Sequence, residues 1–101
     1  GVLGVRTTSQ GVLFVQPAAI GTTIAVAGDF NGWSADTHPM RLNPSLGVFE
    51  RTIPLPPGRH QYRIVVDGRW IPDPYNPIEA INPFGGANSV VVVPEADQLR
   101  P

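Results

Sequence analysis

Two tryptophans stand beside turn-forming residues and could bind a flat ligand. Trp33 follows Asn31-Gly32 in "VAGDFNGWS" (26–34), and Trp70 follows Asp67-Gly68 in "VVDGRW" (65–70). An exposed indole can cover the C–H face of a sugar ring while nearby polar side chains bind the hydroxyl groups. Tryptophan is also commonly a core residue in sandwich domains. The two motifs therefore leave two interpretations open, a pair of core residues or a binding platform.

Arg63 is predicted to lie beside Trp70 on the same face of a hairpin. Asp67-Gly68 is a typical two-residue hairpin turn, because both of its positions require positive φ. Pairing across this turn puts Val65 opposite Trp70, and Arg63 lies two residues further along on the same face. We expect the hairpin to present a guanidinium and an indole side by side, although a lone strand arginine is more often only solvated.

Catalytic chemistry has little support in the sequence. A glycosidase needs two carboxylates about 5–10 Å apart, and the only suggestive pair, Asp67 and Asp73, sits beside residues that favour turns. His38 and His60 are the only histidines, and without a third ligand cluster a packing role for His60 is favoured over a metal site. There is no nucleophile elbow and no glycine-rich loop opening a helix. We predict a binding domain with no catalytic residues, metal or cofactor.

Composition narrows the choice of partner. The chain has 101 residues, which favours one domain, and its formal net charge is −1 with 15% charged residues. Such a weak field predicts neither a nucleic-acid nor a membrane partner, and no apolar run approaches the ~18 residues of a membrane span. Cysteine is absent, which is compatible with a reducing cytoplasm. Because the chain begins with Gly rather than Met, we expect a fragment of a longer protein.

The elements that would position these residues are predicted to be strands. With 11 glycines and 12 prolines, the composition favours short strands and tight turns over helices. Runs rich in Val, Ile, Thr and aromatic residues predict strands, at 11–17, 22–30, 47–55, 59–68 and 88–93. The pattern predicts an all-β, antiparallel β-sandwich.

Three segments are predicted separately from these strands: the two ends of the chain and one proline-rich stretch. We expect a module at 11–94, with 1–10 as an extra edge strand or flexible lead-in and 95–101 as a tail or linker. Within the module, the proline-rich stretch 70–84 cannot be a central strand, since proline lacks the donor that a sheet ladder needs. It is predicted to be a long surface loop.

Alternation within the strands predicts which side chains face the core. In 59–68, Tyr62, Ile64 and Val66 fall on one face. In 22–30, Ala25 and Ala27 alternate with larger apolar residues, which predicts one buried face and one face with small side chains.

Three motifs resemble the family-48 carbohydrate-binding modules. They are "VAGDFNGWS" (26–34), "LPPGRHQYRIVVDGRWIPDP" (55–74) and "NPFGGANSVVVV" (82–93), in the order and with the spacing of that family. The resemblance covers roughly residues 12 to 93 and is strongest to the kinase-type glycogen-binding domains, those of the β subunits of AMP-activated protein kinase. It implies an early-set, immunoglobulin-like β-sandwich.

The resemblance also implies a set of carbohydrate-binding residues. By motif these are Trp33, Arg63, Trp70, Phe84, Gly86 and Asn88. Three of them depart from the kinase-type pattern, which has lysine at 63, leucine at 84 and threonine at 86. Arginine keeps the cation and adds donors, phenylalanine could add a platform, and glycine removes a hydroxyl.

The implied function is noncatalytic binding of α-1,4-linked glucan such as glycogen, starch or maltooligosaccharides. Two alternatives stay open. One is a structural or protein-interaction sandwich that packs against a catalytic domain or a kinase partner. The other is an accessory domain cut from a glucan-branching or debranching enzyme or a kinase-regulatory subunit.

Overall fold

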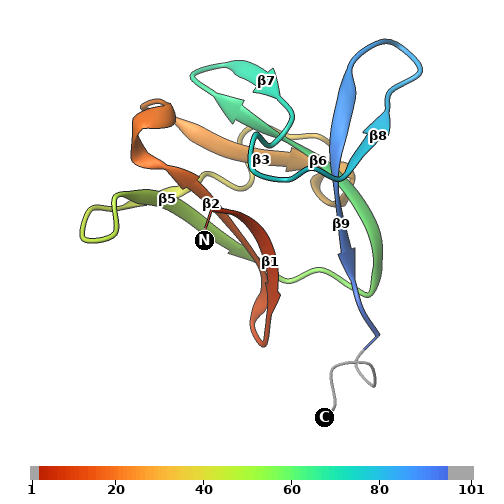
Figure 1. Ribbon diagram of the computed structural model, residues 1–101, viewed down its shortest axis with the longest axis horizontal. Coiled ribbons are helices and arrows are strands. Elements are labelled where there is room, and N and C mark those ends of the chain that lie inside the picture. Colours follow the sequence, from red (N-terminus) through yellow and green to blue (C-terminus); the bar gives the residue numbers. More distant parts are fainter. Residues whose placement is uncertain (1–2, 96–101) are drawn as a thin grey trace.

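The computed structural model describes residues 3–95 of the chain. These residues form nine strands and two single-turn 3-10 helices (Figure 1). In chain order they are β1 (Gly4–Thr8), β2 (Gly11–Pro17), η1 (Ala18–Ile20), β3 (Ile24–Gly28), η2 (Asp29–Asn31), β4 (Arg41–Asn43), β5 (Val48–Ile53), β6 (Gly58–Val66), β7 (Arg69–Ile71), β8 (Glu79–Ile81) and β9 (Ala87–Val93).

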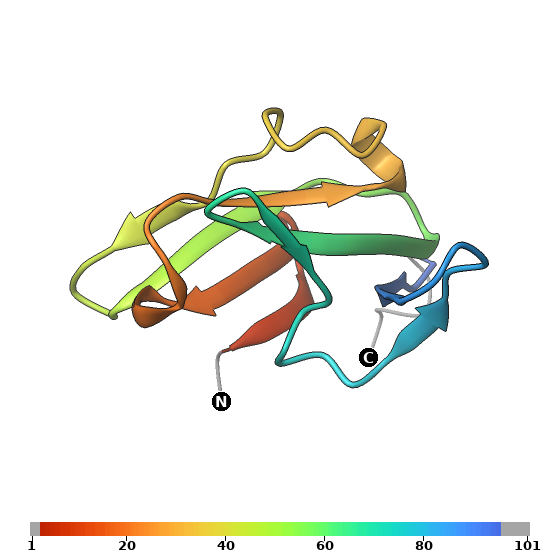
Figure 2. The same cartoon turned by 90° about the horizontal axis from the view of Figure 1, so that it is seen from above.

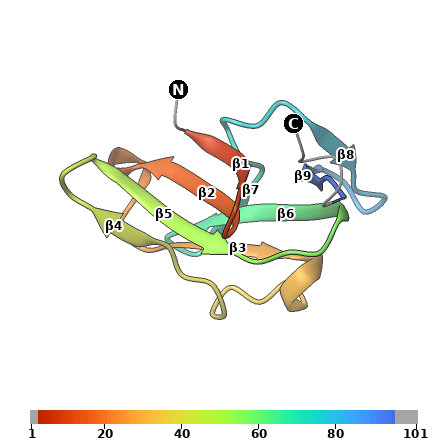
Figure 3. The same ribbon diagram turned by 90° about the horizontal axis from the view of Figure 1, so that it is seen from below.

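The strands form two antiparallel sheets. The first has the order β1-β2-β5-β4 and the second β3-β6-β9-β8, with β7 paired to the end of β6. Figures 2 and 3 show β1, β2 and β5 in one layer and β3 and β6 in the other. The prediction of an all-β, antiparallel sandwich of the immunoglobulin-like type is confirmed.

The core lies between the two sheets. Tyr62, Ile64 and Val66 of β6 are buried on the face that alternation predicts, and Phe14 of β2 meets the Tyr62 ring edge-on with centroids 4.9 Å apart. The same cluster contains Val12, Ile24, Val26, Met40, Phe49, Ile53, Val91 and Val93. Removal of this apolar surface from water is the main favourable term in folding.

Short strands account for most of the differences from the predicted elements. The stretch 70–84 is not wholly a loop, because β7 ends at Ile71 and β8 spans Glu79–Ile81. Three-residue strands such as β4 and β8 are too short to show alternation in sequence. β8 lies at the edge of its sheet, which agrees with the exclusion of this proline-rich stretch from a central position.

β1 pairs with β2 along its whole length and forms an edge of the first sheet. Residues 1–2 and 96–101 lie outside the described part of the chain, so most of the predicted tail at 95–101 falls there. Within residues 3–95, every helix is too short to cross a membrane.

A buried polar network fixes the segment between β7 and β8. The carboxylate of Asp73 accepts hydrogen bonds from Gln16 Nε2 at 2.8 Å and from Tyr62 Oη at 2.7 Å. Its backbone N–H donates to Ser89 Oγ at 2.7 Å, and Asn76 Nδ2 donates to Tyr62 Oη at 3.0 Å. Burial, and then the nearby Asp73 charge, raise the pKa of Tyr62 far above its usual range. The phenol therefore stays protonated and can donate to Asp73.

Candidate binding site

One hollow on the outer face of the second sheet gathers most of the residues singled out in the sequence. Its volume is about 290 Å³, and its lining residues are Trp33, Arg63, Trp70, Asn82 and Asn88. They come from three distant segments of the chain: the η2 turn, the β6–β7 hairpin and the β8–β9 hairpin. In Figure 1 the two hairpins lie at the same end of the molecule.

The η2 turn sets the position of Trp33. Gly32 is left-handed with φ 66°, and Trp33 itself has φ 59°. Asn31 Oδ1 accepts the backbone N–H groups of Gly28 at 3.0 Å and Ser34 at 3.2 Å, which closes the turn. Asn31-Gly32 forms a turn but does not join a β-hairpin, because β3 and the next strand, β4, belong to different sheets. The segment from 29 to 40 instead turns back beside β3 (Figures 2 and 3), where Pro39 forms an isolated antiparallel bridge with Ala25.

Trp33 is neither a core residue nor fully exposed. Its indole packs on Ala25 and Ala27 of β3 and on Val65 of β6, which are buried beneath it. The small side chains predicted for this face of β3 leave the room that the ring occupies. Trp33 is half-buried, whereas Trp70 is 40% exposed. Both rings line the same hollow.

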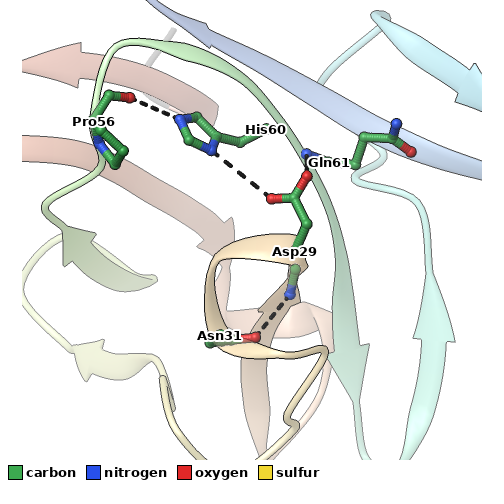
Figure 4. A network of polar contacts seen from close by, with 6 residues as sticks. Asp29, Asn31, Pro56, His60 and Gln61 are labelled. Atoms are coloured by element: carbon green, nitrogen blue, oxygen red, sulfur yellow. Dashed lines mark hydrogen bonds and ion pairs between the residues drawn. The ribbon is translucent and has the colours of Figure 1, made fainter.

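A second set of contacts ties η2 to β6 (Figure 4). Asp29 Oδ2 accepts the backbone N–H of Gln61 at 3.0 Å, and Asp29 Oδ1 lies 3.8 Å from His60 Nδ1. His60 Nε2 donates to the carbonyl of Pro56 at 2.7 Å. At Gly28 a Cβ atom would lie 2.6 Å from the carbonyl oxygen of Gln61, so only glycine allows this approach. The turn that carries Trp33 is thus held against the central strand of the site.

The β6–β7 hairpin supplies Trp70 and Arg63. The predicted pairing of Val65 with Trp70 is confirmed. β9 pairs with β6 up to Tyr62 and β7 pairs from Ile64 onward, so Arg63 lies where the neighbour of β6 changes. That junction brings Trp70 and the start of β9 to the same guanidinium.

Asn88 and Arg63 form a connected polar pair. Arg63 Nε donates to Asn88 Oδ1 at 2.8 Å and to the carbonyl of Ala87 at 3.2 Å. Asn88 Nδ2 in turn donates to Gln61 Oε1 at 3.0 Å. The hollow therefore contains an ordered polar pair beside two aromatic rings, and a few fixed polar groups around an apolar surface can orient a small ligand.

The β8–β9 turn holds the other predicted site residues. Asn82, at its start, accepts the backbone N–H of Phe84 through Oδ1 at 2.9 Å and lines the hollow. Sequence reasoning missed Asn82, although the Asn-Pro pair at 82–83 marks a turn whose tip can carry function. Phe84 is 97% exposed and is not among the lining residues. Gly86 is next to the guanidinium of Arg63: a Cβ atom there would lie 3.1 Å from Nη2.

The two suggestive carboxylates have separate structural roles. Asp67, at the hairpin turn with φ 48°, accepts the backbone N–H groups of Thr22 at 3.1 Å and Thr23 at 2.8 Å. Asp73 is buried in the polar network and also accepts the N–H of Tyr75 at 2.9 Å, which makes a local turn. Their role in turns is the one that the sequence favours.

The histidines also have protein partners. His38 Nδ1 accepts from Asn31 Nδ2 at 2.8 Å. Burial, and then the charge of Arg51, lower the pKa of His38. Both histidine rings lie near Phe30, with centroid distances of 6.2 Å for His38 and 6.3 Å for His60. Among residues 3–95 there is no group of three or more His, Asp or Glu side chains that could hold a metal ion.

Comparison with known families shows which family the chain belongs to. Residues 15–99 match the family described as the glycogen recognition site of AMP-activated protein kinase. The chain belongs to this family. The glycogen-recognition family is one of noncatalytic carbohydrate-binding modules, so the function expected from the sequence motifs is confirmed at this level.

The curated relatives are longer proteins of two kinds. The chain is 35% identical over 77 residues to 5'-AMP-activated protein kinase subunit beta-1 of Rattus norvegicus, which covers 76% of this chain and 27% of the subunit. It is 34% identical to subunit beta-2 of Mus musculus over the same length. It is 42% identical over 72 residues to 1,4-alpha-glucan branching enzyme GlgB 2 of Rhizobium johnstonii, covering 68% of this chain and 10% of the enzyme. The chain thus spans about a quarter or less of these relatives.

Proposed function

We propose that the chain binds α-1,4-linked glucan in the hollow on its second sheet, without cleaving it. Trp33 and Trp70 stack on the apolar faces of glucose units, and Arg63 and Asn88 hydrogen-bond to their hydroxyl groups, with Asn82 at the rim. The observation that carries this proposal is the convergence of two indoles and an ordered Arg–Asn pair on one hollow.

The geometry favours modest affinity. The hollow lies on a sheet face, where a sugar ring keeps part of its surface in water. Its polar groups are few, and each hydrogen bond to a sugar hydroxyl replaces a hydrogen bond between that hydroxyl and water. We expect dissociation constants between about micromolar and millimolar, or roughly 4–8 kcal/mol. Phe84, beyond the lining of the hollow, is placed to touch only a longer glucan chain.

Titration with maltoheptaose tests the proposal, followed by calorimetry and by indole fluorescence. Replacing Trp70 with alanine should weaken binding by about tenfold or more, since a stacked aromatic ring is a dominant contact. Leu46→Ala is a matched control, because Leu46 is 67% exposed on the turn between β4 and β5 and does not line the hollow. It should leave the affinity unchanged.

Two results would contradict the proposal. One is the absence of a response to millimolar maltoheptaose, and the other is equal affinity in wild type and Trp70→Ala.

Cellohexaose, with β-linked glucose, should bind less tightly than maltoheptaose. Prolonged incubation with maltoheptaose should release no new reducing ends. The carboxylates of Asp67 and Asp73 both hold turns, and that of Asp73 is also bonded within the buried network.

We also propose an organisation for the chain. Residues 11–94 form the binding module, β1 extends its first sheet, and 95–101 are a tail or linker. The relatives support two settings for such a module, a kinase regulatory subunit or a glucan-branching enzyme. Sequencing of the full gene product distinguishes the two.

A further inference from the structure

Two neighbouring glycines in the β8–β9 turn differ in one respect that concerns the site. Both have positive φ, +106° at Gly85 and +81° at Gly86. A Cβ atom added at Gly85 would meet nothing within 4 Å. A Cβ atom added at Gly86 would lie 3.1 Å from Nη2 of Arg63, closer than an ordinary van der Waals contact. Only Gly86 therefore leaves space that the guanidinium uses.

The other end of the guanidinium cannot easily move away. Arg63 Nε is bound to the carbonyl of Ala87 and to Asn88 Oδ1. The amide of Asn88 is itself held by its bond to Gln61 Oε1 and is buried. A group placed at position 86 would therefore displace the terminal nitrogens or break the Nε contacts. Within the described residues the terminal nitrogens have no protein partner, so they are the donors left for a ligand in the hollow.

We propose that Gly86 is a positioning residue whose missing side chain admits the guanidinium of Arg63 into the hollow. Arg63 and Gly86 then act as a matched pair. A planar guanidinium needs more width than the compact ammonium of lysine, and the absence of a Cβ atom at 86 provides it. This inference rests on the proposed glucan site, because the terminal nitrogens that Gly86 positions are those offered to the sugar.

A double-mutant cycle tests the pair with maltoheptaose as the probe. Gly86→Ala should weaken binding by about threefold or more, within the usual range for coupled neighbours. Gly85→Ala carries a similar backbone strain but no contact with Arg63, and its affinity should stay within about twofold of wild type. In an Arg63→Ala background, Gly86→Ala should have no further effect. An equal effect in both backgrounds, or equal effects of the two glycine variants, would overturn the inference.

A measurement without sugar separates this inference from the proposed function. In the free protein, the NMR signal of the Arg63 Nε–H group reports its two hydrogen bonds. Gly86→Ala should shift this signal or speed its exchange with water, whereas Gly85→Ala should not. An unchanged signal in Gly86→Ala would overturn the positioning role. If wild type fails to bind maltoheptaose, the proposed function fails, and this comparison still decides whether Gly86 positions Arg63.

Discussion

The two tryptophans of the hollow have different surroundings, and this difference has consequences that can be measured. Trp33 covers Ala25, Ala27 and Val65, so it belongs to a small apolar cluster as well as to the site. Trp70 is on the short strand β7 and is among the exposed large apolar residues. We therefore expect the first ring to contribute to folding as well as to the proposed binding, and the second mainly to the proposed binding.

Trp33→Ala should therefore lower the free energy of unfolding, by about 2 kcal/mol, because it uncovers the apolar cluster. Trp70→Ala should lower it by less than about 1 kcal/mol. Urea denaturation followed by circular dichroism measures both values without depending on indole fluorescence. Equal losses in the two variants would show that Trp33 does not cover the cluster.

At the scale of elements, the connections between strands are held by polar side chains rather than by regular structure. The segment between β7 and β8 is fixed by the buried network around Asp73, and the η2 turn is closed by Asn31. Residues that line the hollow stand next to each connection. Trp70 and Asn82 flank the segment between β7 and β8, and Trp33 follows the η2 turn. The stability of these loops and the shape of the site are thus linked.

Asp73→Ala should destabilise the fold by about 3 kcal/mol. The change leaves Gln16 Nε2 and Tyr62 Oη without their acceptor inside the protein, and an unpaired buried donor is costly. Asp36→Ala is the matched control, since Asp36 is exposed, and should change stability by less than about 0.5 kcal/mol. Denaturant titration of both variants makes the comparison, and similar midpoints would contradict the role of the network.

His38 should make the η2 turn sensitive to acid. Its pKa in the folded protein is lowered from 6.5, so the unfolded state binds the proton more readily. The stability that neutral His38 gives the folded state is complete above about pH 6.5. It is lost as pH falls through the lower pKa that His38 has in the folded protein. Protonation would also remove the acceptor that His38 Nδ1 offers to Asn31.

Denaturation of wild type and His38→Gln at about pH 7.5 and about pH 5.5 measures this effect. Wild type should lose more stability than His38→Gln between the two values, because glutamine does not titrate. Parallel losses in the two proteins would assign the acid sensitivity to other groups.

At the scale of the whole molecule, the second sheet carries the proposed site on its outer face while its inner face completes the core. β6 serves both roles, with Tyr62 and Ile64 inward and Arg63 and Val65 outward. The net charge of the chain is −1, so no strong overall field acts on a ligand. At the proposed site, recognition of a neutral sugar would then depend on direct contacts alone.

Maltoheptaose binding should accordingly be insensitive to salt. Between about 0.05 and 0.5 M sodium chloride, the dissociation constant should change by less than about twofold, because screening acts only on interactions between charges. Calorimetric titration at the two salt concentrations measures it. A steep loss of affinity with salt would indicate a charged ligand and contradict a neutral glucan.

The elements that local chemistry controls could be predicted from the amino-acid sequence. Alternation identified the inward residues of β6, and the Asp67-Gly68 turn set the register that pairs Val65 with Trp70. Both follow from the two-residue period of a strand and from the φ values a tight turn requires. The three motifs also identified the family.

The positions of Trp33, Asn82 and Gly86 around Arg63 could not be predicted in this way and are seen only in the folded chain. The turn with Trp33 and the turn with Asn82 and Gly86 are each distant from Arg63 in the sequence, and no local pattern states that they meet it. They converge because β7 and β9 share one edge of β6, and because the segment after η2, with Trp33, folds back over the small residues of β3. Pairing between distant strands depends on how the whole core packs, and so the half-burial of Trp33 and the space at Gly86 appear only in the folded chain.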